Sequence, residues 1–237
     1  MGRAFEYRKA RKMKRWASMA KAFTRIGREI SIAVKEGGPE PDYNPRLRLA
    51  IQNAKVANMP KANVENAIKK AVSKDAEDYQ EIVYEGYAPH GVALVVETAT
   101  NNPTRTVANV RHIFSKYGGN LGTSGSVDYM FSRVAIFKVA AEGQDLEELE
   151  LSLIDFGLDE LRKEEENLVL QCAFEDFGNL QKGLEELGLE VVESELIRLP
   201  SHTKELSDEE VEDVIKLIEK MEDDEDVVNV FHNMDME

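Results

Sequence analysis

The chain has 237 residues, of which 42% are hydrophobic and 32% are charged, a balance typical of folded domains with solvated surfaces. Its longest apolar run, residues 92–96, is far shorter than the ~18 residues that a membrane-spanning helix needs. No apolar segment follows the basic N-terminus, which argues against a secretory signal. The single cysteine, Cys172, cannot form an internal disulfide, which favours a reducing compartment such as the cytoplasm.

The net charge of −15 is distributed very unevenly along the chain. Residues 1–75 hold 18 basic and 7 acidic side chains, a net charge of +11, whereas the rest holds 12 basic and 38 acidic ones, a net charge of −26. This asymmetry predicts that the two parts have different partners. One interpretation of the acidic part is that its charge only keeps the protein soluble. The alternative is that it binds basic proteins.

Residues 1–79 are expected to form a basic helical bundle. A first helix ends at Gly37-Gly38-Pro39, because glycine adopts the conformation that follows a helix and proline cannot extend one. A second helix starts at Asn44-Pro45, where asparagine caps free N–H groups and proline fits the first turn. A third follows Met59-Pro60. The apolar residues of the first helix recur at helical spacing: Met19, Phe23, Ile26, Ile30 and Ala33.

Basic residues interleaved with aromatic ones predict a nucleic-acid interface in this domain. Arginine and lysine neutralise phosphates, and aromatic rings can stack on unpaired bases. The alternative is a basic segment that is solvated or folds back on the acidic modules. The candidate residues in the first helix are Arg8, Lys9, Arg11, Lys12, Lys14, Arg15, Trp16, Lys21, Arg25 and Arg28. Candidates further along the chain are Arg46, Arg48, Arg105 and Arg111.

The rest of the chain alternates between strand and helix patterns. Region 81–131 is expected to form strands 81–87, 92–96 and 127–131 with a helix after Pro103. Region 133–199 is expected to form strands 134–141, 167–174 and 189–198 with helices 145–156 and 177–187. A last helix opens at Ser207, with Glu210 completing a capping box, and strand 227–231 follows it.

A single helix and strand cannot bury their apolar faces alone, so the C-terminal tail must complete another module. The expected fold class is therefore α+β with three domains. Residues 1–79 form the helical domain, residues 80–132 and 200–237 form a discontinuous α/β domain, and residues 133–199 form an α/β domain inserted into it.

No pattern indicates catalysis. The glycine-rich run 119–126 leads into a predicted strand rather than a helix and lacks the lysine of a nucleotide-binding loop, so it is interpreted as a tight connection. The four histidines are scattered, and Cys172 has no nearby partner. The run 222–226 lacks the spacing of a calcium loop and is interpreted as a solvated acidic turn. We expect no enzyme, cofactor, metal or small-molecule substrate.

Several short motifs, in order along the chain, resemble the signature of the YebC/PmpR family: 44–48, 54–55, 58–61, 67–70, 85–92, 101–102, 105–108, 114–116, 118–122 and 125–127. The resemblance implies a helical N-terminal domain and two ferredoxin-like α/β domains, one interrupted by the other. It implies no catalytic residues. Many members open with Gly-His-Ser-Lys-Trp-Ala, whereas here the tryptophan is Trp16, so only the basic and partly aromatic character carries over.

Two functions follow from this resemblance. Family members are commonly described as probable DNA-binding transcriptional regulators. Others, including a mitochondrial translational activator of cytochrome oxidase, act in translation at the ribosome and on proline-rich stretches. The lack of a major-groove motif and the acidic modules count against duplex DNA, and interleaved aromatics suit irregular RNA. An adaptor that binds only proteins is a third interpretation.

Overall fold

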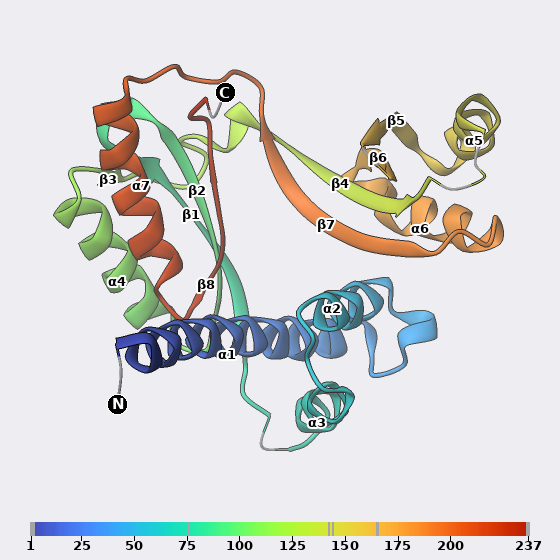
Figure 1. Ribbon diagram of the computed structural model, residues 1–237, viewed down its shortest axis with the longest axis horizontal. Coiled ribbons are helices and arrows are strands. Elements are labelled where there is room, and N and C mark those ends of the chain that lie inside the picture. The colour runs from blue at the N-terminus through green and yellow to red at the C-terminus, as the bar shows by residue number, and fades with distance from the viewer. Residues whose placement is uncertain (1–2, 75, 142, 144, 165, 236–237) are drawn as a thin grey trace. The chain divides into compact units, whose positions relative to one another are not determined.

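The computed structural model describes residues 3–74, 76–141, 143, 145–164 and 166–235, with side chains from Met19 onward (Figure 1). Its contacts divide the chain into two compact units. The first comprises Met1–Val83, Val96–Ile113 and Ile218–Val230, and the second comprises Tyr84–Val95, Phe114–Leu217 and Phe231–Glu237. This is a different partition from the three domains expected above, which stay a prediction. The α+β fold class is confirmed, because an N-terminal helical region is followed by two separate four-stranded sheets.

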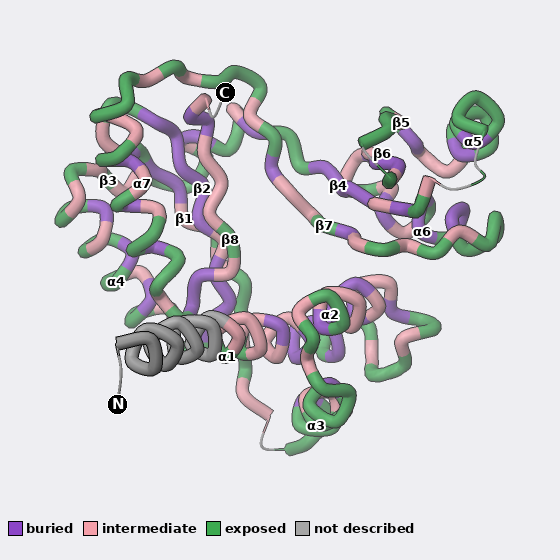
Figure 2. Tube along the Cα trace, in the orientation of Figure 1, coloured by how far each residue is buried: buried purple, intermediate pink, exposed green. Residues whose placement is uncertain are grey.

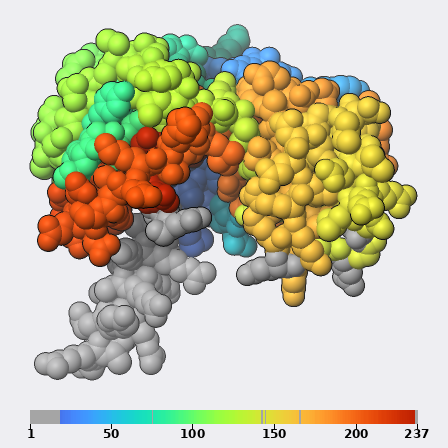
Figure 3. Space-filling model, turned by 90° about the horizontal axis from the view of Figure 1, so that it is seen from above, coloured from blue at the N-terminus to red at the C-terminus, as the bar shows by residue number. Residues whose placement is uncertain are grey.

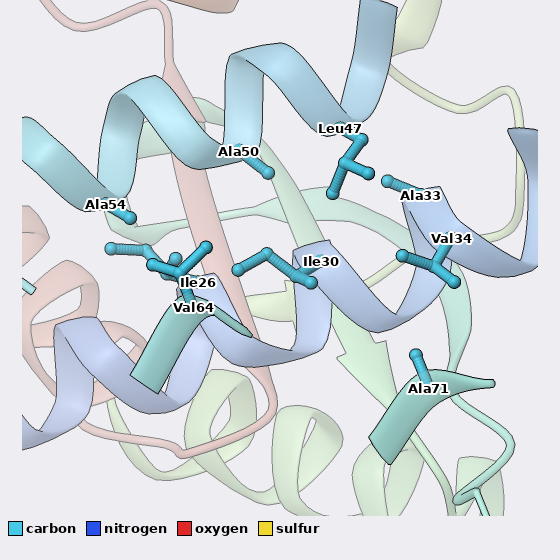
Figure 4. Packing of buried hydrophobic residues seen from close by; sticks show 9 residues of the cluster. All are labelled: Ile26, Ile30, Ala33, Val34, Leu47, Ala50, Ala54, Val64 and Ala71. Carbon is cyan, nitrogen blue, oxygen red and sulfur yellow. The ribbon is translucent and has the colours of Figure 1, made fainter. Parts of the chain in front are cut away.

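The N-terminal region consists of three helices, as expected: α1 (Arg3–Gly37), α2 (Pro45–Val56) and α3 (Lys61–Ala71). Ile30, Ala33 and Leu47 are fully buried between α1 and α2, because they recur on the facing sides of both helices. Val64 of α3 packs into the same cluster (Figure 4). The predicted apolar stripe of α1 therefore forms this core from Ile26 onward.

Asn44 fixes the junction between α1 and α2. Its side-chain oxygen accepts a hydrogen bond from the backbone N–H of Leu47 at 3.0 Å, which confirms the predicted cap. Its side-chain amide donates to the carbonyl of Ala33, near the end of α1, at 2.7 Å and to that of Gly38, just after the helix, at 2.9 Å. One buried side chain thus ends one helix and begins the next.

The first sheet has the strand order β3-β1-β2-β8. Strand β8 adjoins β2, so the C-terminal strand does join the sheet of region 81–131, as the sequence predicted. The strand expected over 127–131 is wrong: residues Asp128–Met130 form a 3₁₀ turn. The four strands are β1 (Gln80–Tyr87), β2 (Ala93–Thr100), β3 (Asn120–Leu121) and β8 (Val227–His232).

A buried carboxylate explains why that segment is not a strand. Glu85 is only 4% exposed, and it accepts backbone hydrogen bonds from Gly125 at 2.6 Å and from Val127 and Asp128 at 2.8 Å each. These three N–H groups are therefore unavailable for strand pairing. Burial acts to raise the pKa of Glu85, but the three backbone donors outweigh it and hold the pKa below its ordinary value.

Helix α4 (Pro103–Lys116) packs on this sheet, because a Cβ atom on Gly86 of β1 would lie 3.0 Å from Phe114. Helix α7 (Asp208–Glu222) lies beside α4. A Cβ atom placed on Gly119 would lie 3.0 Å from both Phe114 of α4 and Leu217 of α7. Their surfaces adjoin in Figure 3, where α4 is green and α7 orange-red. The carboxylate half of the capping box at the start of α7 is confirmed, because Glu210 accepts a hydrogen bond from the backbone N–H of Ser207 at 2.9 Å. The Ser207 hydroxyl also donates to this carboxylate at 2.9 Å.

The second sheet is antiparallel with the order β5-β6-β4-β7. Phe137 of β4 stacks on Phe177 of α6 at a centroid distance of 5.2 Å, and Figure 2 shows the buried residues along these elements. The sequence missed strand β5, because this edge strand is mostly exposed and charged. The elements are β4 (Phe131–Ala140), α5 (Leu146–Leu153), β5 (Leu158–Glu164), β6 (Asn167–Ala173), α6 (Phe177–Glu186) and β7 (Val191–Pro200).

Within the described residues, no helix is long and apolar enough to cross a membrane, and no group of three or more His, Cys, Asp or Glu side chains is arranged to hold a metal ion. Burial raises the pKa of the Cys172 thiol to about 12. A thiol that remains protonated at neutral pH is a poor nucleophile.

The glycine-rich run is a tight connection with close backbone approach, as the sequence predicted. A Cβ atom on Gly86 would lie 2.5 Å from the carbonyl oxygen of Asn120, and one on Gly119 would lie 2.6 Å from the carbonyl oxygen of Tyr87. Strands β1 and β3 pair at this point, with Gly86 opposite Leu121. Both glycines allow the two strands to come together.

We expect Gly86→Ala to destabilise the protein by at least about 2 kcal/mol, because backbone must move to admit the methyl group. The matched control is Gly27→Ala in α1, where a Cβ atom would meet nothing within 4 Å. This control should stabilise the helix by about 0.5–1 kcal/mol. Urea unfolding measures both, and a neutral Gly86→Ala would contradict the close approach.

Candidate nucleic-acid interface

The densest basic segment of the sequence lies in the first half of α1. Residues from Arg3 belong to this helix, whose 35 residues run without interruption to Gly37. The predicted nucleic-acid-binding side chains before Met19 lie outside the described residues, and only their helical backbone is described. They are Arg8, Lys9, Arg11, Lys12, Lys14, Arg15 and Trp16.

The next two predicted residues contact the turn after α7. The Lys21 ammonium lies 2.7 Å from the carboxylate of Asp223. The guanidinium of Arg25 donates to the backbone carbonyl of Glu222 at 2.6 Å. A surface cavity of about 150 Å³ lies between the helix and the turn, lined by Ala20, Lys21, Thr24, Arg25, Asp224 and Glu225.

Arg28 reaches furthest into the protein, with only 11% of its side chain exposed. Its guanidinium lies 2.9 Å from the Asp226 carboxylate and donates to the carbonyls of Ala99 at 3.1 Å and Glu225 at 2.5 Å. It also lies 5.3 Å from the ring centroid of Tyr79, within cation–π range. The charge of Arg28 is thus compensated inside the chain.

Asp226 is the centre of this cluster and is 2% exposed. Arg105 donates to it at 2.8 Å, Thr106 at 2.7 Å and Thr100 at 3.3 Å. Burial acts to raise the pKa of Asp226, but hydrogen bonds from Arg105 and Thr106 and the nearby guanidinium charges outweigh it and lower the pKa. The interpretation of residues 222–226 as a wholly solvated turn is therefore corrected at Asp226.

The remaining predicted residues differ in their surroundings. Arg46 bridges the carboxylates of Glu36, at 2.6 Å, and Glu81. Arg105 keeps 48% of its side chain exposed although it pairs with Asp226, and Arg111 is exposed on α4. Arg48 donates to the carbonyls of Pro41 and Asp42. These contacts do not test nucleic-acid binding, so the role of these residues stays a prediction.

A partly buried carboxyl in α1 modifies the charge of this segment. Burial raises the pKa of Glu29 to about 7, and the neighbouring Arg46 charge only partly offsets that effect. The carboxylate of Glu81 acts in the same direction as burial. Glu29 is therefore partly protonated near neutral pH and subtracts less than one full charge from the basic helix.

Sequence reasoning missed Asp226 and the cluster around it. Arg28 and Asp226 are 198 positions apart, and Arg105 and Asp226 are 121 apart. No local spacing connects residues so distant in the chain. The sequence offered one signal: Asp226 directly precedes the strand predicted at 227–231, and the residue that begins a buried strand is itself often buried.

The fold joins a basic helical region to two four-stranded sheets with their helices. Comparison with known families identifies residues 3–74 as a TACO1/YebC protein N-terminal domain. Residues 79–234 match the TACO1/YebC second and third domain. The chain belongs to this family, which confirms the resemblance seen in the sequence.

Its relatives carry regulatory names. A protein of Porphyromonas gingivalis is 57% identical over 99% of this chain and 97% of its own length, and one of Flavobacterium johnsoniae is 58% identical over 99% of both. Each is called a probable transcriptional regulatory protein. A conserved hypothetical protein from Aquifex aeolicus has a similar structure, with a TM-score of 0.77, 40% identity and coverage of 91% of this chain and 90% of its own. The family is thus one of regulatory proteins.

Replacing Asp226 with asparagine should destabilise the protein by about 3 kcal/mol at pH 7, because it leaves a nearly buried arginine without its counter-charge. The folded pKa of Asp226 is lowered, so its contribution is present above the unfolded pKa and is lost as pH falls through the folded pKa. The stability gap between wild type and Asp226→Asn should therefore narrow below about pH 4.

Urea unfolding between pH 7 and pH 3 measures this gap. Glu219→Gln is the matched control, because Glu219 is exposed on α7 and its loss should change stability by less than about 0.5 kcal/mol. A gap that stays constant across this pH range would contradict the assignment of a charged Asp226 as the centre of the cluster.

Proposed function

We propose that the protein is a non-enzymatic regulator that binds nucleic acid through the first half of α1, with duplex DNA as its target in transcription. The names of its relatives support a regulatory role. The net charge of +11 over residues 1–75 supports phosphate contact. Phosphate contacts of this kind position a protein on nucleic acid without reading its sequence.

The observation that carries this proposal is that the basic residues in the second half of α1 already have partners within the chain. Lys21, Arg25 and Arg28 are paired within the chain. By sequence, Arg8, Arg11, Lys12 and Arg15 recur at three- and four-residue spacing within the same helix, and this spacing places residues on one helical face. The proposal therefore assigns the principal phosphate contacts to these earlier residues.

Replacing Arg11, Lys12 and Arg15 together with glutamine should weaken binding to random duplex DNA at least about tenfold, because three phosphate contacts are lost. The wild-type slope of log affinity against log salt should be near −3 to −5, and the variant's slope should be shallower by about 2 to 3. Fluorescence anisotropy at several salt concentrations measures both quantities.

The matched control replaces Lys163, Lys182 and Lys216 with glutamine, which removes the same charge from the acidic part of the chain. This control should bind DNA with wild-type affinity or slightly more weakly. An equal loss in both triple variants would show that net charge alone governs binding and would contradict the assignment to α1.

The second candidate function is an RNA- or ribosome-binding translation factor that assists synthesis of proline-rich stretches. The net charge of −26 beyond residue 75 favours it, because this charge repels bare duplex DNA and suits a partner that also presents basic proteins. The aromatic residues among the cations at the N-terminus also suit irregular RNA.

A competition experiment separates the two functions. Labelled random duplex DNA is bound near physiological salt, and ribosomes or unlabelled duplex are added at equal nucleotide concentration. For the DNA regulator, we expect unlabelled duplex to compete as well as ribosomes or better. Displacement by ribosomes at far lower concentration would establish the translation function and make DNA binding incidental.

A further inference from the structure

The turn that follows α7 lies against the basic face of α1. We call residues Glu222–Asp226 the acidic turn. It meets α1 at Lys21, Arg25 and Arg28, and positions four and then three residues apart lie on one face of a helix. The acidic turn therefore follows this face over two helical turns.

The contacts match those that a phosphate backbone would make. Lys21 faces the carboxylate of Asp223 at 2.7 Å. Arg25 and Arg28 donate to the carbonyl oxygens of Glu222 at 2.6 Å and Glu225 at 2.5 Å. Anionic and carbonyl oxygens thus occupy donors that phosphate oxygens would otherwise accept from.

We propose that the acidic turn is an autoinhibitory contact, which competes with nucleic acid for Lys21 at the outer end of the Lys21–Arg28 part of the basic face. This inference rests on the proposed function and adds its regulation. In the free protein the turn covers this part of α1, and nucleic acid bound by the first half of the helix displaces the outer end of the turn from Lys21.

The two ends of the acidic turn differ in how firmly they are held. Asp226 is 2% exposed and is fixed by Arg28, Arg105 and Thr106. Asp223 is 54% exposed and Lys21 is 41% exposed, and solvent screens such a pair strongly. The Asp226 end is therefore an anchor, and the Asp223 end is the part that nucleic acid can displace.

Asp223 has a second cation that retains it after displacement. Lys220, on the last turn of α7, lies 3.1 Å from the Asp223 carboxylate. Hydrogen bonds from Lys21 and Lys220 lower the pKa of Asp223, so it is charged at neutral pH. When Lys21 binds a phosphate instead, Asp223 therefore stays paired with Lys220, and the free-energy cost of exchanging the partner of Lys21 is small.

The test is a double-mutant cycle in the full-length protein, with random duplex DNA as the probe. Asp223→Asn should raise affinity about two- to fivefold, the fold-change that corresponds to losing one exposed ion pair. The salt slope should also steepen by up to about 0.9, because one more phosphate contact forms. Lys21→Gln should change wild-type affinity little but should remove the gain in the Asp223→Asn background.

Glu219→Gln, which removes the same charge one turn earlier in α7, is the matched control and should leave affinity near that of wild type. An equal gain in Glu219→Gln would show a general charge effect and overturn the inference. Wild-type affinity in Asp223→Asn, even with altered stability in urea, would show a purely structural contact and overturn it too. Absence of DNA binding in every variant, wild type included, would instead contradict the proposed function.

Discussion

The carboxylate of Asp226 holds together segments that are far apart in the chain. It contacts Arg28 of α1, Thr100 at the end of β2, and Arg105 and Thr106 of α4. A nearly buried charge is stable only when its counter-charges and hydrogen bonds are all in place. The packing of α1 against β2 and α4 in its compact unit therefore depends on this cluster. The position of the acidic turn depends on it as well.

This arrangement separates two roles that look alike in composition. Arg28 and Arg105 carry the same charge as the basic residues near the N-terminus, yet their charges are compensated by a buried aspartate. Lys21 and Arg25 are intermediate, because their partners lie on an exposed turn. The strength of internal pairing thus decreases along α1 from Arg28 to Lys21.

Backbone constraints decided the parts of the fold that hydrophobic patterns could not. The Glu85 carboxylate accepts hydrogen bonds from the backbone N–H groups of Gly125, Val127 and Asp128. The segment that the sequence predicts as a strand therefore forms a 3₁₀ turn. Gly86 and Gly119 admit a neighbouring carbonyl where any side chain would collide. Strand β5 is an edge strand with little buried area, so its sequence shows charge rather than alternation. In each case the deciding contact lies outside the local window.

The sequence by itself determined the features that depend on near neighbours. Three features arise between residues a few positions apart, where helix geometry determines which side chains are in contact. They are the cap at Asn44, the contact of Ser207 with Glu210 and the apolar stripe of α1. The uneven charge and the family motifs were also visible there. Only the tertiary structure decided which cations are already paired, because Arg28 and Asp226 meet across 198 positions that no local rule connects.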